Sequence, residues 1–200
     1  ILGSSNNQIG GTTAAERNII SANTVDGVQI RDGGTSNNVV RGNYIGLDVT
    51  GTIDLGNTNQ GVAIVSGATN NTIGGTAASA GNVISGNNGE GVRIINAGTT
   101  GNAILGNSIY GNGTLGIDVN GDGLTANDGA KTAGQPNLLM DFPVIQWASL
   151  SGATLTVSGY IGIAAGDTDF AGARVEFFES LDAAGVNGEA QTYLGFLTAD

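Results

Sequence analysis

The segment DVNGDG, residues 118–123, contains the best candidate for chemistry in this 200-residue chain. Side chains with oxygen ligands stand at its positions 1, 3 and 5, and a glycine stands at position 6. This spacing matches the opening of an EF-hand-type calcium loop. The twelfth position, where an EF-hand has a bidentate Glu, is Gly129, and an aspartate comes one place before it. The candidate calcium ligands are Asp118, Asn120, Asp122 and Asp128. The alternative is that these residues form a solvated turn that caps the preceding repeats.

A pair of carboxylates, Asp26 and Glu90, is the second candidate, because a polysaccharide hydrolase needs two acids on one face. The two acids precede equivalent segments of a repeat with one unit between them, so they should stand roughly 10 Å apart on stacked strands. Duplication of the repeat explains the pair without catalysis. A lyase would need a base beside a cation, and the chain has one lysine, Lys131, and scattered arginines. The sequence therefore predicts no catalytic residue and no cofactor other than calcium.

These candidates lie on or beside an internal repeat. The stretch from Asn6 to Gly46 recurs 64 positions later, from Asn70 to Tyr110, without a gap. Self-similarity at a fixed spacing indicates a chain that stacks one structural unit on the next.

Three short motifs recur in a fixed order within the repeat, and each alternates apolar with polar residues, as short strands do. The first, Asn-x-Ile/Val, begins at Asn7, Asn38, Asn71 and Asn102. The second, Asn-x-Ile, begins at Asn18, Asn43, Asn82 and Asn107. The third, Gly-Val/Ile-x-Ile/Val, begins at Gly27, Gly61, Gly91 and Gly116. Three strands per turn predict an all-β fold that contains a parallel β-helix of about four coils over residues 1–124.

The predicted β-helix assigns a direction to each side chain of the third motif. One inward column contains Val28, Val62, Val92 and Ile117, and a second contains Ile30, Ile64, Ile94 and Val119. The outward positions are Gln29, Ala63, Arg93 and Asp118. We expect the asparagines that begin the first motif to stack at a corner and pass amide hydrogen bonds between coils, as scaffold rather than ligands.

The composition changes near Gln135, where aromatic residues and longer alternating runs begin. Candidate strands are 144–148, 153–161, 173–179 and 192–198, which predicts the start of an antiparallel sandwich over residues 137–200, after a linker at 125–136. The adjacent Phe177 and Phe178 should point to opposite faces of their strand. An immunoglobulin-like sandwich normally has about seven strands in about 100 residues, so the missing strands are either cut away or supplied by another chain. Ile1 aligns with Val65, just past a third-motif strand, and the chain is interpreted as a fragment of a longer protein.

Charge and composition exclude several partners and sites. The net charge is −11 with no histidine and only six Lys and Arg, so no basic patch is available for nucleic acid or an anionic membrane. Cysteine is absent, which excludes disulfides and thiolate metal sites. No segment approaches 18 consecutive apolar residues, so we expect no membrane insertion.

The pattern NTIGGTAA, GNVISGN and GVRI, followed by GIDVNGDG, QPN and FPVI and then by EFFES and GEAQTYLGFLTAD, resembles a known repeat. It is similar to the right-handed β-helix repeat of very large secreted or surface proteins of bacteria. In those proteins an immunoglobulin-like module typically follows the array. The resemblance implies a secreted or cell-surface location and an adhesin or exoprotein type, and it specifies architecture more closely than activity.

Two functions from different classes follow. The first is a non-enzymatic structural or adhesive segment whose partners are neighbouring subunits or further domains of a longer chain. In one version the incomplete sandwich accepts a strand from a neighbouring subunit and so builds a filament. The second is a β-helix module that binds or degrades a surface polysaccharide.

Overall fold

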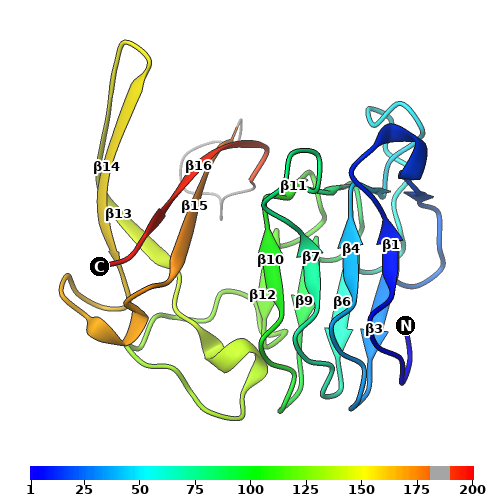
Figure 1. Ribbon diagram of the computed structural model, residues 1–200, viewed down its shortest axis with the longest axis horizontal. Coiled ribbons are helices and arrows are strands. Elements are labelled where there is room, and N and C mark those ends of the chain that lie inside the picture. The colour runs from blue at the N-terminus through cyan, green and yellow to red at the C-terminus, as the bar shows by residue number, and fades with distance from the viewer. Residues whose placement is uncertain (181–189) are drawn as a thin grey trace.

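The first 120 residues form short parallel strands in three stacked sheets, as the computed structural model shows (Figure 1). The model describes residues 1–180 and 190–200. Sheet I contains β1 (Gln8–Gly10), β4 (Val39–Arg41), β7 (Thr72–Gly74) and β10 (Ala103–Leu105). Sheet II contains β2 (Ile19–Ile20), β5 (Tyr44–Ile45), β8 (Val83–Ser85) and β11 (Ser108–Tyr110). Sheet III contains β3 (Val28–Arg31), β6 (Val62–Val65), β9 (Val92–Ile94) and β12 (Ile117–Val119).

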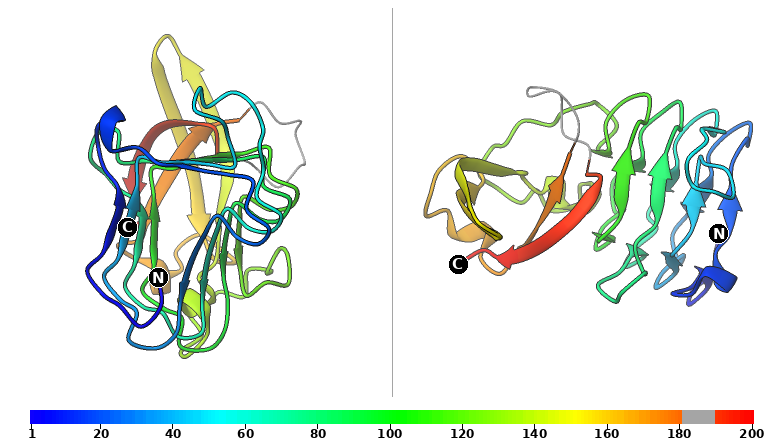
Figure 2. Two further views of the ribbon diagram at one scale, coloured as in Figure 1. Left: turned by 90° about the vertical axis from the view of Figure 1, so that its right-hand side faces the viewer. Right: turned by 90° about the horizontal axis from the view of Figure 1, so that it is seen from above.

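The chain visits sheets I, II and III in turn and then returns to sheet I, and one such passage is called a coil below. Figure 2 (left) looks along the stack, so that successive coils overlap. Every recurring motif coincides with a strand, and all strand pairs within the three sheets are parallel. This confirms parallel, stacked β-structure, and the arrangement fits a parallel β-helix.

The core is a set of aliphatic columns that run through the stack. Pairing aligns Val28, Val62, Val92 and Ile117, and it aligns Ile30 with Ile64, Ile94 and Val119. The second and third members of each column are fully buried. Each such side chain contributes roughly 1.5–3 kcal/mol on burial. Ile117 keeps the inward register but is 44% exposed, because β12 is the last strand of sheet III among the described residues.

Three asparagine ladders connect the coils. In each ladder the side-chain Nδ2 of one Asn donates to the Oδ1 of the Asn in the next coil, over 2.7–3.0 Å. The first two contain the eight asparagines of the first and second motifs. The third was not predicted and contains Asn23, Asn57, Asn87 and Asn112. Its sequence signal is the 64-residue spacing of Asn23 and Asn87, which follow Ser-Ala and Ser-Gly.

The two parts of the chain are joined at the last coil. Asn137, in the short 3-10 helix η2 (Pro136–Leu139), accepts a 3.0 Å hydrogen bond from the Asn102 backbone N–H and so extends the first ladder. Ala190 forms an antiparallel bridge with Ile109 of β11. The Glu176 carboxylate accepts a 2.7 Å hydrogen bond from the Gly106 N–H and also pairs with Arg174. The C-terminal part therefore covers the exposed edges of sheets I and II.

The C-terminal part contains two separate antiparallel pairs, which spread apart in Figure 2 (right). One pair is the hairpin of β13 (Pro143–Ser151) and β14 (Thr154–Ile161). The other is β15 (Arg174–Glu179) with β16 (Thr192–Thr198), and the 3-10 helix η3 (Thr168–Phe170) lies between the pairs in sequence. All four predicted strands are present. Phe177 lines a cleft between the pairs, and Phe178 packs edge-on against Tyr193. Gly188 and Glu189, which belong to the resembling pattern, lie outside the described residues.

All helices among the described residues are short 3-10 turns. They are η2, η3 and η1 (Ala14–Glu16). None of these helices is long and apolar enough to cross a membrane.

The ladders should account for a large share of the stability of the stack. Replacing Asn71 with Ala removes the Oδ1 that accepts hydrogen bonds from the backbone N–H and the side-chain Nδ2 of Asn38. These two buried donor groups of Asn38 then lose this acceptor. Each unpaired buried group costs about 1–3 kcal/mol, so we expect a loss of at least about 2 kcal/mol in chemical unfolding. The exposed Asn59 is the matched control, and Asn59→Ala should change stability by less than about 0.5 kcal/mol. Equal losses in the two variants would contradict a structural role for the ladder.

The loop after β5 contains a carboxylate that predicts a pH effect. Asp48 Oδ1 accepts hydrogen bonds from the Thr50 hydroxyl and from the backbone N–H groups of Thr52 and Ile53, at 2.7–3.2 Å. These hydrogen bonds, of which the one from the Thr50 side chain has the largest effect, lower the pKa of Asp48 from 3.8 to about 2. The contact therefore stabilises the loop above about pH 4 and is lost as the pH falls toward 2. A carboxyl NMR titration should show a midpoint near 2 in the parent and in Thr50→Ser, and a higher midpoint in Thr50→Val.

Candidate functional site

Asp118 is buried although it points away from the aliphatic core. Its side chain is on the outward face of β12, yet the residue is only 2% exposed. The carboxylate accepts hydrogen bonds from the backbone N–H of Gly121 at 2.9 Å and of Gly123 at 3.1 Å. Asp118 thus closes the turn after the last strand of the stack. The alternative to a calcium site was a solvated turn. The turn is present, but the Asp118 carboxylate in it is buried rather than solvated.

Asn120 and Asp122 lie in the same turn and bind each other. The Asn120 Nδ2 donates to one oxygen of Asp122 at 2.8 Å, and the Thr125 hydroxyl is 3.1 Å from the other. Asn120 adopts a left-handed φ of 96°, a conformation that asparagine tolerates better than most residues. The Asn120 amide therefore presents its nitrogen, and not its oxygen, to the neighbouring carboxylate.

The fourth predicted ligand, Asp128, belongs to a different set of contacts. Its backbone N–H and that of Gly129 donate to the two oxygens of Asp141, at 3.3 and 2.9 Å. Asn127 binds the Phe142 carbonyl, the Phe142 N–H and the Gly162 carbonyl, all at 2.8–3.0 Å. Asp141 and Asn127 were missed in the sequence because neither belongs to the repeat or to a known motif. They fasten the segment after the stack to the base of the β13–β14 hairpin.

The structure thus divides the four predicted calcium ligands between two hydrogen-bonded turns. Across residues 1–180 and 190–200, no group of three or more His, Cys, Asp or Glu side chains is placed to hold a metal ion together. Asp118, Asn120 and Asp122 are brought into one turn, whereas the Asp128 carboxylate accepts a hydrogen bond from the Ala130 N–H in the next segment. A calcium site at these four residues remains a prediction.

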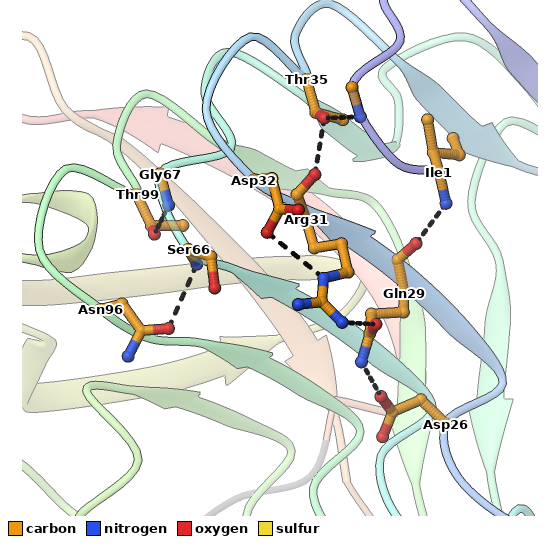
Figure 3. A network of polar contacts seen from close by, with 11 residues as sticks. Ile1, Asp26, Gln29, Arg31, Asp32, Thr35, Ser66, Gly67, Asn96 and Thr99 are labelled. Atoms are coloured by element: carbon orange, nitrogen blue, oxygen red, sulfur yellow. Dashed lines mark hydrogen bonds and ion pairs between the residues drawn. The ribbon is translucent and has the colours of Figure 1, made fainter.

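The outer side of sheet III carries a row of polar side chains, and Figure 3 shows its first members, Asp26 and Gln29, beside Arg31. Asp26 accepts hydrogen bonds from the Gln29 side chain at 2.9 Å and from the Gln60 N–H at 3.4 Å. The Gln60 side chain in turn donates to Glu90 at 2.7 Å. Gln60 therefore stands between the two acids, as expected from the intervening coil. Both carboxylates are engaged with amide groups of the protein.

Arginine side chains lie on the same outer side. Arg31 contacts Asp32 at 3.3 Å, and both side chains are nearly half exposed, so this ion pair contributes little to stability. The Arg93 guanidinium lies against Gly121, where an added Cβ would stand 2.6 Å from Nη2. Because Gly121 also has a left-handed φ of 76°, only glycine fits this position without strain. Arg31 and Arg93 thus have different neighbours: Arg31 contacts Gln29 and Asp32, and Arg93 lies beside the turn at Gly121.

Two hollows lie in the C-terminal half. A cleft of about 400 Å³ separates the two antiparallel pairs, and its lining includes Ile161, Phe170, Val175, Phe177 and Leu197. A second hollow of about 530 Å³ lies at the end of the stack, where Ile117 and Val119 face Met140 and Phe142. Neither hollow brings together the predicted site residues. The second hollow is lined mainly by apolar side chains, whereas the lining of the cleft also includes polar residues such as Asp167 and Asp200.

The role of Asp118 can be measured by removing its carboxylate. Asp118→Ala leaves two N–H groups without an acceptor and should destabilise the chain by about 1–3 kcal/mol. Asp122→Ala, at an exposed neighbour in the same turn, should cost less than about 0.5 kcal/mol. Because both Asp118 oxygens already accept backbone hydrogen bonds, we expect the same costs in calcium and in chelator. Stabilisation of the parent by calcium that disappears in Asp122→Ala would instead establish the predicted ion site.

No family model matches the sequence, and no solved structure matches the fold. The function of the chain therefore has to be argued from its own residues.

Proposed function

We propose that the chain is a non-enzymatic structural or adhesive repeat segment of an extracellular or cell-surface protein. In this proposal residues 1–124 are a right-handed parallel β-helix of about four coils, and residues 137–200 are a partial immunoglobulin-like sandwich. The observation that supports it most is the use of buried asparagines, which are occupied by one another along the stack. The buried asparagine amides hold one coil to the next, so they are not available to act on a substrate.

The interactions between coils favour a stiff element. Each coil is connected to the next by three parallel strand pairs, by three asparagine contacts and by the aliphatic columns. A coil cannot bury its own apolar side chains without its neighbours, so the array is stable only as a stack. Such a stack can hold two attached regions at a fixed separation, which is the task of a spacer.

The acidic surface is compatible with an extracellular location and with assembly controlled by contacts rather than by charge attraction. The net charge of −11 keeps copies apart at long range and disfavours nucleic acid and anionic lipid as partners. Neighbouring subunits or further domains would then contact the segment through open strand edges. The proposal does not depend on calcium at Asp118, Asn120, Asp122 and Asp128. An ion bound there would stiffen the junction between the two parts further, and the Asp122→Ala comparison tests for it.

A polysaccharide-binding or polysaccharide-degrading module is the second candidate, and one observation favours it. The row formed by Asp26, Gln29, Gln60 and Glu90 presents amide and carboxylate groups along one side of sheet III. Planar polar groups of this kind can hydrogen-bond sugar hydroxyls. Their hydrogen bonds to one another favour a supporting role for the row.

Incubation with a panel of neutral and acidic polysaccharides separates the two candidates. We expect no new reducing ends and no unsaturated products, with or without calcium, because Asp26 and Glu90 are both bound by Gln60. The variants Asp26→Asn and Glu90→Gln should be indistinguishable from the parent. Turnover by the parent that either variant loses would overturn the structural proposal. Calorimetric binding without turnover would support the binding form of the second candidate.

A further inference from the structure

The last coil is joined to the later part of the chain by hydrogen bonds at the ends of sheets I and II. Their donor–acceptor distances are 2.7–3.0 Å, which is the range of well-formed hydrogen bonds. We call this set of hydrogen bonds the docking contacts. They connect Gly98 with Gly134, Thr99 and Asn102 with Asn137, Gly106 with Glu176, and Ile109 with Ala190.

The docking contacts are not backed by a shared apolar core. The buried apolar cluster of the stack runs from Val28 to Ile109, and no described residue after Ile109 belongs to it. Where sheet III ends, Ile117, Met140 and Phe142 line a hollow of about 530 Å³ and are each 41–44% exposed. Side chains across an open hollow lack the close contacts that a packed core provides. The coils are therefore held together by packing and hydrogen bonds, and the described part of this interface by hydrogen bonds.

The docked segment also contains a strained turn. Asn137, Leu138 and Leu139 of η2 have φ angles of 40°, 61° and 46°, in the left-handed region. Asparagine tolerates this region, whereas leucine is disfavoured there because its Cβ crowds the following carbonyl oxygen. Each left-handed leucine lowers the population of such a turn roughly 5- to 30-fold relative to an ordinary backbone. A run of this kind persists only where surrounding contacts impose it.

Asn137 anchors the strained turn to the last coil. Its backbone N–H donates to the Thr99 carbonyl at 2.8 Å. Its side-chain amide accepts from the Asn102 N–H at 3.0 Å and donates to the Asn102 carbonyl at 2.7 Å. Once these hydrogen bonds break, Leu138 and Leu139 can return to ordinary backbone angles. The strain therefore favours the state in which Asn137 has left the stack.

We propose that the docking contacts form a release point, at which the C-terminal part detaches from the stack while the coils stay folded. In the docked state the hydrogen bonds are formed, and in the released state they are open to water and the turn is relaxed. The last coil keeps its strand pairs with the third coil in both states. The C-terminal part lies beside the end of the stack (Figure 1), so it can move away without crossing a coil.

The release has a use under the proposed structural function, on which this step rests. A stack of coils is stiff, and a segment fixed rigidly to its end would keep one orientation. Release would let the C-terminal part reorient on the stack, and the strand pairs and apolar columns of the coils would be kept. Local opening of this kind is expected where few buried apolar contacts oppose it.

Neighbouring residues of the last coil report separately on the two kinds of contact. The Asn102 N–H donates across the docking contacts, and the N–H of the next residue, Ala103, donates to the third coil at 2.8 Å. The Gly106 N–H donates to the C-terminal part, and the Ser108 N–H donates to the third coil at 2.9 Å. Fraying of the last coil would open all four hydrogen bonds. Release would open only those of Asn102 and Gly106.

Amide hydrogen exchange of the full chain, followed by NMR, tests the release. After correction for intrinsic rates, Asn102 and Gly106 should exchange at least about 100-fold faster than Ala103 and Ser108, because local opening costs less free energy than unfolding of a coil. Equal protection within each pair would overturn the proposal, whether the four groups exchange slowly or quickly together.

Two substitutions test the contribution of the strained turn. Leu138→Gly removes the Cβ that disfavours the left-handed angles, and it should slow the exchange of Asn102 about threefold, since the greater freedom of glycine after release offsets part of the relief. Leu138→Val introduces a β-branched residue, which tolerates these angles least, and should speed the exchange. Ala103 should exchange as in the parent in both variants. Loss of apolar packing alone would speed the exchange of Asn102 in both, and that result would overturn the strained release.

The release and the proposed function fail separately. Polysaccharide turnover would overturn the structural function whatever the exchange rates are. Equal protection of Asn102 and Ala103 without turnover would overturn the release point and leave the structural function in place.

Discussion

The fold depends on the pairing of buried asparagine amides along the stack. Each Oδ1 accepts a side-chain N–H and a backbone N–H from the preceding coil, so the amide group both continues the ladder and satisfies the backbone at a corner. A buried amide without these partners would cost more than the hydrogen bond contributes. The stack is therefore stable when consecutive coils stand one strand spacing apart with their corners in register. That condition fixes the parallel pairing and, through it, the aliphatic columns.

The ladders also give the stack a direction with two unlike ends. Donors point toward the C-terminal end, so the last coil needs acceptors that a further coil would otherwise supply. Asn137 supplies one to the first ladder, Glu176 accepts the N–H of Gly106, and Ala190 pairs with the edge of sheet II. Within residues 1–180 and 190–200 sheet III receives no strand at this end, and Ile117 stays partly exposed. Polar contacts therefore cover the end of the stack at sheets I and II. At sheet III the end faces the hollow lined by Met140 and Phe142.

Repetition decides how much of this could be predicted. The motifs predicted every strand of the stack and both inward columns, because each position is specified several times in the sequence. The third ladder was missed because three of its four members, Asn57, Asn87 and Asn112, lack the apolar residue two positions later that marks the other two ladders. Asn137, Asp141 and the burial of Asp118 were beyond prediction for another reason: each depends on where a non-repeated segment returns in space. The calcium pattern at residues 118–123 was visible, but its hydrogen bonds to Gly121, Gly123 and Thr125 follow from the local turn.

The same reasoning explains why the C-terminal strands differ from those of the stack. Inside the stack a neighbouring coil covers each apolar face, and the sequence repeats that neighbour. The β13–β14 and β15–β16 pairs have no repeated neighbour, and two-stranded antiparallel pairs are marginal in water unless something packs on them. Their closed region is limited to the surroundings of Ile161 and Phe170. Beyond this region no described residue packs on the hairpin, which is why apolar side chains such as Leu150 and Leu155 stay exposed.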